Sequence, residues 1–70
     1  MKLLIVIEKT GTGFSACSPD LPGCVATGAT RKQVEGAMKK AIEFHLRGMR
    51  AEGLKVPQPR SYSTYVEVPA

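Results

Sequence analysis

The stretch DLPGCVATGAT at residues 20–30 combines the signals of a turn, a strand and a helix start. Pro22 presets φ at about −65° and Gly23 tolerates a positive φ, so this pair predicts the central positions of a type II turn. Residues 24–27 (CVAT) are small or β-branched and predict a short strand. Thr30, with Gln33 three residues later, forms a capping box that begins a helix. The local order is therefore turn, strand, helix.

The length of the chain limits what it can bury. Seventy residues allow a single domain, residues 1–70, and a chain of this size buries only about 60% of the surface that its unfolded form exposes. We therefore expect extra stability from a second copy or a partner. The apolar run at residues 3–7 is far shorter than the roughly 20 residues that span a bilayer, and no small-residue cleavage site follows it. We expect a cytoplasmic protein.

The first predicted strand, residues 2–8, is apolar on both faces. Leu4 and Val6 point to one face and the alternate side chains to the other, so the strand should lie inside the sheet and be covered on both sides. One helix covers one face of a sheet. We therefore expect a homo-oligomer or a bound partner to cover the other face, with Leu4 and Val6 as the candidate oligomer face.

The remaining elements follow in chain order. A glycine-containing hairpin loop leads to a second strand at residues 14–17, and the apolar period becomes helical over residues 31–52, with a Schellman ending at Gly53. Residues 62–68 alternate as a last strand. The fold class is therefore α+β, in the order β-β-β-α-β, with one helix packed on a mainly antiparallel four-stranded sheet. A right-handed crossover predicts the strand order 3-2-1-4.

The loop at residues 18–23 carries two prolines, which stiffen it and fix how its side chains are presented. A stiff loop loses little entropy when it binds, so Asp20 and Leu21 are candidate partner contacts. The alternative, that the loop only sets the connection between two strands, has at least equal weight.

The cysteines and the single histidine do not predict a metal site. Cys17 and Cys24 flank the turn loop, and small buried thiols are favoured over a disulfide in a chain without an export signal. Zinc needs four ligands, and only His45 would join the cysteines without carboxylates. We expect no metal, no cofactor and no catalytic residue.

The formal charge of +4 comes from ten Lys and Arg residues against six acidic ones. Six of the cations lie within the predicted helix, residues 31–52, where they are mixed with acidic residues at helical spacing. A solvated helix face explains this pattern best. Binding to an acidic protein surface or to nucleic acid is the alternative, although no aromatic residues are interleaved for base stacking.

Several of these motifs together resemble one family. They are the run SPDLPGC at residues 18–24, TGAT at residues 27–30, Ala37, Ala41 and Ile42 in the helix, and Glu52-Gly53 followed by Pro57 and Pro59. This pattern covers almost the whole chain and resembles the HicB-like antitoxins. The resemblance implies a partial ribonuclease H-like fold. It also implies an antitoxin that binds and masks HicA, a small toxin that cleaves messenger RNA.

Two features depart from that family pattern. HicB proteins commonly carry a second, C-terminal DNA-binding domain, for which residues 1–70 leave no room, so we do not expect DNA binding by this chain. An antitoxin that faces a basic RNA-binding toxin is expected to be acidic, whereas this chain is basic. Either its acidic residues gather on one surface, or the chain is a stand-alone regulatory module with another partner.

The competing class is a metal-dependent nuclease. Ribonuclease H chemistry needs carboxylates that converge on two magnesium ions about 4 Å apart. Glu8, Glu35, Glu43 and Glu67 are spread along the chain and do not recur in a pair or cluster. We therefore predict a non-enzymatic binding protein.

Overall fold

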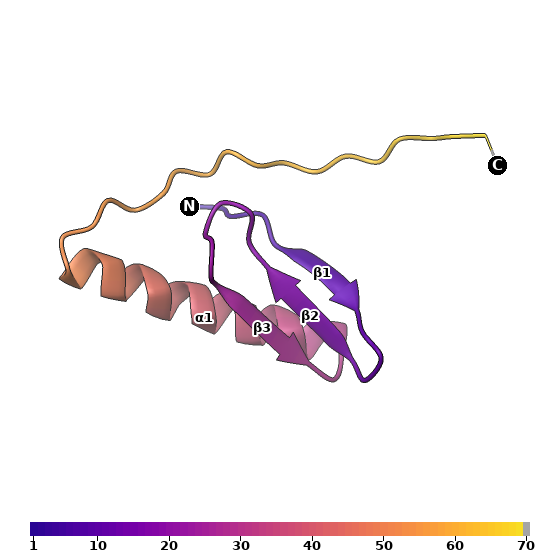
Figure 1. The fold of residues 1–70 in the computed structure, drawn as a ribbon, viewed down its shortest axis with the longest axis horizontal. Coiled ribbons are helices and arrows are strands. Elements are labelled where there is room, and N and C mark those ends of the chain that lie inside the picture. The colour runs from indigo at the N-terminus through magenta and orange to yellow at the C-terminus, as the bar shows by residue number, and fades with distance from the viewer. Residues whose placement is uncertain (70) are drawn as a thin grey trace.

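The computed structural model describes residues 1–69 and contains three strands followed by one helix. The elements are β1 (Val6–Lys9), β2 (Phe14–Cys17), β3 (Val25–Gly28) and α1 (Arg31–Ala51). The strands form an antiparallel sheet in the order β1-β2-β3, and α1 lies across one face of it (Figure 1). After the helix, the chain continues as an extended segment to residue 69. The predicted α+β class, with one helix on an antiparallel sheet, is confirmed.

The register of the strands sorts their side chains between two faces. Ile7 is opposite Ala16, which is opposite Ala26, and this row faces α1. The neighbouring row, one residue along each strand, points to the other face, because successive side chains of a strand alternate. We call this second face the outer face of the sheet.

Local hydrogen bonds fix the turn before β3, as the sequence predicts. The Cys24 N–H donates to the Leu21 carbonyl at 3.2 Å, and Gly23 between them has a φ of 85°. A positive φ at the third position is the requirement of a type II turn and explains the glycine.

Both ends of α1 are capped by the residues predicted for them. Thr30 Oγ1 accepts a hydrogen bond from the Gln33 N–H at 3.1 Å, and Gln33 Oε1 accepts one from the Ala29 N–H at 3.2 Å. At the other end, Gly53 has a φ of 73° and the Leu54 N–H donates to the Met49 carbonyl at 2.8 Å. This is the Schellman pattern.

The core lies between α1 and the sheet. Its buried members are Ala16, Leu21, Cys24, Val34, Met38 and Leu46. The three helical members lie at i, i+4 and i+12, which is the spacing of one helix face. The helix packs mainly against β3 and β2. The inner side of β1 is therefore the least covered part of the sheet.

The prediction of a fourth strand at residues 62–68 is wrong for the described chain. Residues 54–69 are extended but have no strand partner, and they pass the β1 side of the sheet without joining it (Figure 1). Consequently β1 is an edge strand instead of an inner one, and it begins at Val6, later than predicted. The alternation of residues 62–68 indicates extended backbone, but pairing also needs a strand edge within reach. The ribonuclease H-like fold stays a prediction.

Candidate protein-interaction surfaces

Asp20 holds the middle of the extended C-terminal segment, residues 54–69. Its Oδ2 accepts hydrogen bonds from the N–H groups of Arg60 (3.1 Å) and Ser61 (3.0 Å), and its Oδ1 accepts one from the Ser61 hydroxyl (2.8 Å). The Ser61 N–H is the largest cause that lowers the pKa of the Asp20 carboxyl, because donors stabilise its charged form. We call these three bonds the Asp20 clasp. The clasp connects the turn loop to a segment 40 residues away.

Leu21, the other residue predicted to contact a partner, lies in the core. Its side chain is only 1% exposed and belongs to the buried cluster beneath the sheet. The stiff loop thus turns Leu21 inward while Asp20 holds the C-terminal segment. Contact of these two residues with a partner stays a prediction, and the burial of Leu21 gives it no support.

The outer face of the sheet carries an uncovered apolar row. Val6 is opposite Cys17, and Cys17 is opposite Val25, so the three side chains cross all three strands. Val25 is 67% exposed, and Val6 and Cys17 are also exposed. Leu4, which is half-buried, precedes Val6 by two residues. The sequence predicted Leu4 and Val6 for this face. It did not predict Cys17 and Val25, because their place beside Val6 follows from the register of the three strands.

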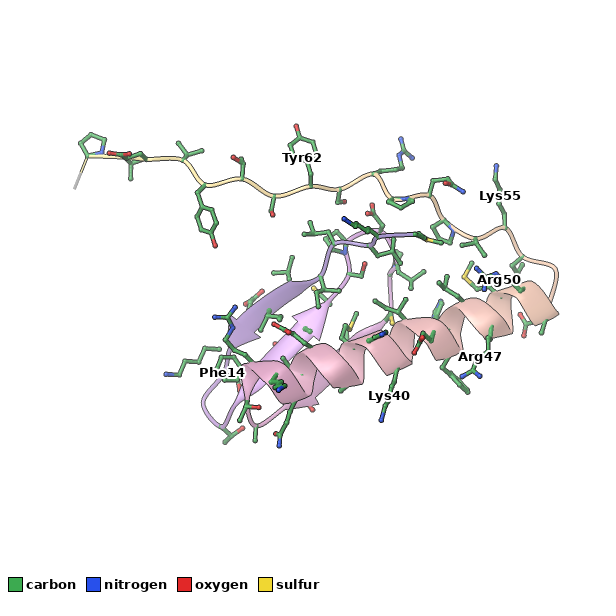
Figure 2. The ribbon with its side chains drawn as sticks, turned by 180° about the vertical axis from the view of Figure 1, so that it is seen from behind. Phe14, Lys40, Arg47, Arg50, Lys55 and Tyr62 are labelled. Carbon is green, nitrogen blue, oxygen red and sulfur yellow. The ribbon has the colours of Figure 1, made fainter. Side chains whose placement is uncertain are left out.

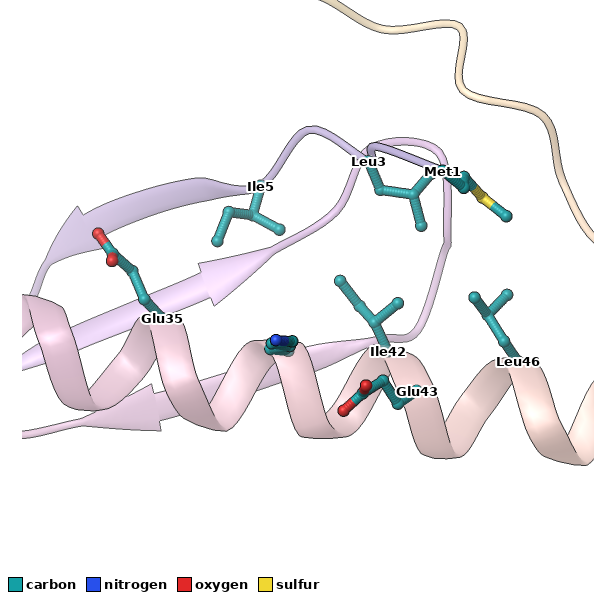
Figure 3. A pocket seen from close by; sticks show the side chains of 8 residues that line it. Met1, Leu3, Ile5, Glu35, Ile42, Glu43 and Leu46 are labelled. Carbon is teal, nitrogen blue, oxygen red and sulfur yellow. The ribbon is translucent and has the colours of Figure 1, made fainter.

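A second apolar surface is a groove between α1 and the N-terminal residues. Met1, Leu3 and Ile5 line one wall, and Ile42 and Leu46 line the other (Figure 3). Its volume is about 330 Å³, and three charged residues, Glu35, Lys39 and Glu43, border it. The groove exists because α1 packs mainly against β3 and β2 and covers Leu3 and Ile5 only in part. Sequence reasoning did not find it, since it depends on where the helix lies.

The solvent face of α1 is basic and carries one exposed aromatic ring. Lys40 and Arg47 point away from the sheet (Figure 2). Phe44 is 73% exposed on the same helix. The positive charge of the chain therefore lies mainly on the helix layer. The outer face of the sheet is on the opposite layer, and among the alternating positions 2, 4, 6 and 8 only Lys2 and Glu8 are charged.

The C-terminal segment exposes large apolar side chains. Tyr62 points away from the sheet and the helix (Figure 2), Tyr65 is fully exposed, and Val66 and Val68 are 77% and 69% exposed. We call residues 62–68 the C-terminal arm. Such exposure of aromatic and β-branched residues is characteristic of interaction surfaces.

The four carboxylates considered for nuclease chemistry do not form a metal-binding group, although Glu35 and Glu43 both border the groove. Glu8 lies in β1, Glu35 and Glu43 in α1, and Glu67 in the C-terminal arm. Within residues 1–69, no group of three His, Cys, Asp or Glu side chains is arranged to hold a metal ion. No helix of the described chain is long and apolar enough to cross a membrane.

The two cysteines are free and differ in environment. Cys24 is buried, as predicted, and burial raises the pKa of its thiol. Cys17 is exposed on the outer face of the sheet, so the prediction of a buried thiol is wrong for this residue.

The fold and these surfaces define a small α+β domain with apolar surface that its own chain does not cover. Residues 3–70 match the model of the HicB-like antitoxins of bacterial toxin–antitoxin systems, and the chain belongs to this family. It is 30% identical over 59 residues to a UPF0150 protein of Thermoplasma acidophilum, covering 83% of this chain and 86% of the relative. It is 37% identical over 54 residues to a UPF0150 protein of Helicobacter pylori, covering 77% of this chain and 75% of the relative. No solved structure matched the chain.

Proposed function

We propose that this protein is an antitoxin that binds a HicA-type toxin in the cytoplasm and masks its messenger-RNA-cleaving site. Membership of the HicB-like antitoxin family supports a binding role over an enzymatic one. The toxin takes the outer face of the sheet. The observation that carries this assignment is the exposed row of Val6, Cys17 and Val25, which no described element of the chain covers.

The distribution of charge supports the same face. A toxin that binds RNA is basic, and the cations of α1 would repel it. The row on the outer face is uncharged and lies on the layer opposite the exposed Lys40 and Arg47 (Figure 2). A basic chain can therefore bind a basic toxin, because the contact is made where its own charge is lowest.

The test is co-expression with the product of the adjacent reading frame, the candidate toxin. The unmodified chain is expected to relieve the growth arrest and to purify with the toxin as a complex. Val25→Ser removes an exposed apolar side chain from the outer face, and Phe44→Ser removes a similarly exposed one from the opposite layer. We expect Val25→Ser to weaken the complex and Phe44→Ser to leave it unchanged. If no complex forms with the unmodified chain, the antitoxin role fails. If only Phe44→Ser weakens the complex, the assignment of the face fails.

A further inference from the structure

We propose that two copies of this chain exchange their C-terminal arms, each arm adding as a strand to the free edge of β1 in the other copy. The proposal concerns contacts between copies, since residues 62–68 form no fourth strand in the sheet of their own chain. It does not depend on the antitoxin role.

The arm has the composition and conformation of a strand that lacks a partner. Its residues YSTYVEV are mostly aromatic or β-branched, the types that favour sheets. The backbone is already extended, and Val66 and Val68 are 77% and 69% exposed. Adding the arm to a sheet edge would pair its backbone groups and cover these side chains.

The edge of β1 offers the matching surface. One side of β1 pairs with β2, and among residues 1–69 nothing pairs with its other side. β1 itself has four residues, and residues 3–5 before it belong to no strand, so that residues 3–9 offer the seven-residue arm a stretch of chain of equal length. A strand added here would run beside Leu4 and Val6 on the outer face. It would also close the groove lined by Leu3 and Ile5 (Figure 3). β3 has four residues, as β1 has, but the turn at Gly23 and the start of α1 at Arg31 leave little chain on either side of β3 along which an added strand could continue.

The Asp20 clasp fixes the point at which the arm leaves the body of its own chain. It fixes Arg60 and Ser61 beside the turn loop, and from there the arm runs past the sheet and ends beyond it (Figure 1). The arm is thus presented outward, while the β1 edge of the same chain stays open.

A second copy of the chain can pair with both the arm and the free edge of β1 at once. Each chain carries one arm and one free β1 edge, so a two-fold exchange uses both and leaves neither exposed. Charge does not oppose the pairing, because Glu67 is the only charged residue of the arm, whereas residues 2–9 contain two lysines and one glutamate. The cations of α1 belong to the other layer of each copy.

The test uses the purified chain without any toxin, so its outcome is independent of the proposed antitoxin function. Sedimentation equilibrium is expected to show a dimer. Val66→Pro removes an N–H from the middle of the arm and should raise the dimer dissociation constant by about tenfold or more. Gln58→Pro is the matched control, because it lies between two prolines outside the arm, and it should leave the dimer unchanged. A chain that ends at Ser61 keeps the clasp and is expected to be a monomer.

A mixed sample of isotope-labelled and unlabelled copies tests the exchange directly. Intermolecular nuclear Overhauser effects are expected between residues 62–68 of one copy and residues 3–9 of the other. A monomer at millimolar concentration would overturn the proposal, as would equal dissociation constants for Val66→Pro and Gln58→Pro. A dimer whose arm contacts only its own chain, or only a different surface of the other copy, would also overturn it.

Discussion

The carboxylate of Asp20 accepts a hydrogen bond of 3.0 Å from the N–H of Ser61, a residue 41 positions later in the chain. The Arg60 N–H and the Ser61 hydroxyl donate to the same carboxylate. These bonds connect the loop between β2 and β3 to the segment that follows α1. The direction of the C-terminal arm therefore depends on one side chain in the turn loop.

Replacing Asp20 by Asn is expected to release the arm. Asparagine keeps one acceptor oxygen, whereas the carboxylate uses both of its oxygens to accept three bonds. The N–H groups of Arg60 and Ser61 should then exchange with solvent as fast as those of an unstructured chain, which amide hydrogen exchange measures. Glu67→Gln removes the same charge within the arm and is the control. Unchanged protection of Ser61 in the Asp20→Asn variant would contradict the role of the clasp.

Acidification should release the arm in the same way. The pKa of Asp20 is lowered in the folded chain, mainly by the Ser61 N–H, so the folded state binds its proton more weakly than the unfolded state. The stabilisation of the folded chain by the ionised Asp20 carboxylate is therefore fully present above the ordinary aspartate pKa of about 3.9. It is lost as the pH falls through the lower pKa that Asp20 has in the folded chain. The chemical shift of the Ser61 amide proton, followed through the acid range, should titrate with a midpoint below 3.9, the ordinary value. A midpoint above that value would show that the clasp does not form.

Leu21 should matter for stability more than for binding. Its side chain is 1% exposed in the core, and truncating such a leucine to alanine costs about 2–5 kcal/mol of the free energy of unfolding. Leu54→Ala is the control, because Leu54 is half exposed and its truncation should cost less than about 0.5 kcal/mol. Urea denaturation at one fixed protein concentration compares the two. If Leu21→Ala left the free energy of unfolding unchanged but weakened toxin binding, Leu21 would be a partner contact after all.

The features that the sequence predicts correctly are those with local causes. The turn at Pro22 and Gly23 and the capping box at Thr30 and Gln33 each involve residues within four positions of one another. The left-handed Gly53 at the end of α1 is of the same kind. Such features depend on backbone geometry and on one or two hydrogen bonds, so they can be predicted without knowledge of the tertiary fold.

The features that the sequence did not predict depend on distant parts of the chain. The alternation at residues 62–68 indicates extended backbone but does not show which strand edge, if any, lies within its reach. Likewise, the apolar character of Leu4 and Val6 predicted a candidate oligomer face, but only the strand register adds Cys17 and Val25 to that face. Asp20 was singled out for the stiffness of its loop, and its observed hydrogen-bond partner follows more than 40 residues later, which no local pattern reveals.

Two glycines that look alike in the sequence should respond oppositely to replacement by alanine. A Cβ atom on Gly28, at the end of β3, would lie 2.7 Å from the Val34 backbone nitrogen and 3.0 Å from its Cα. Neither atom can yield without moving α1 from the sheet, so Gly28→Ala should lower the free energy of unfolding by about 1–3 kcal/mol. A Cβ atom on Gly36, inside α1, meets nothing within 4 Å beyond the nearby backbone of its own helix, and Gly36→Ala should raise the free energy of unfolding by about 0.4–1 kcal/mol. Thermal and urea denaturation of the two variants at equal concentration measure the difference. Equal stability of both variants would mean that β3 and α1 do not approach each other as closely as the structure shows.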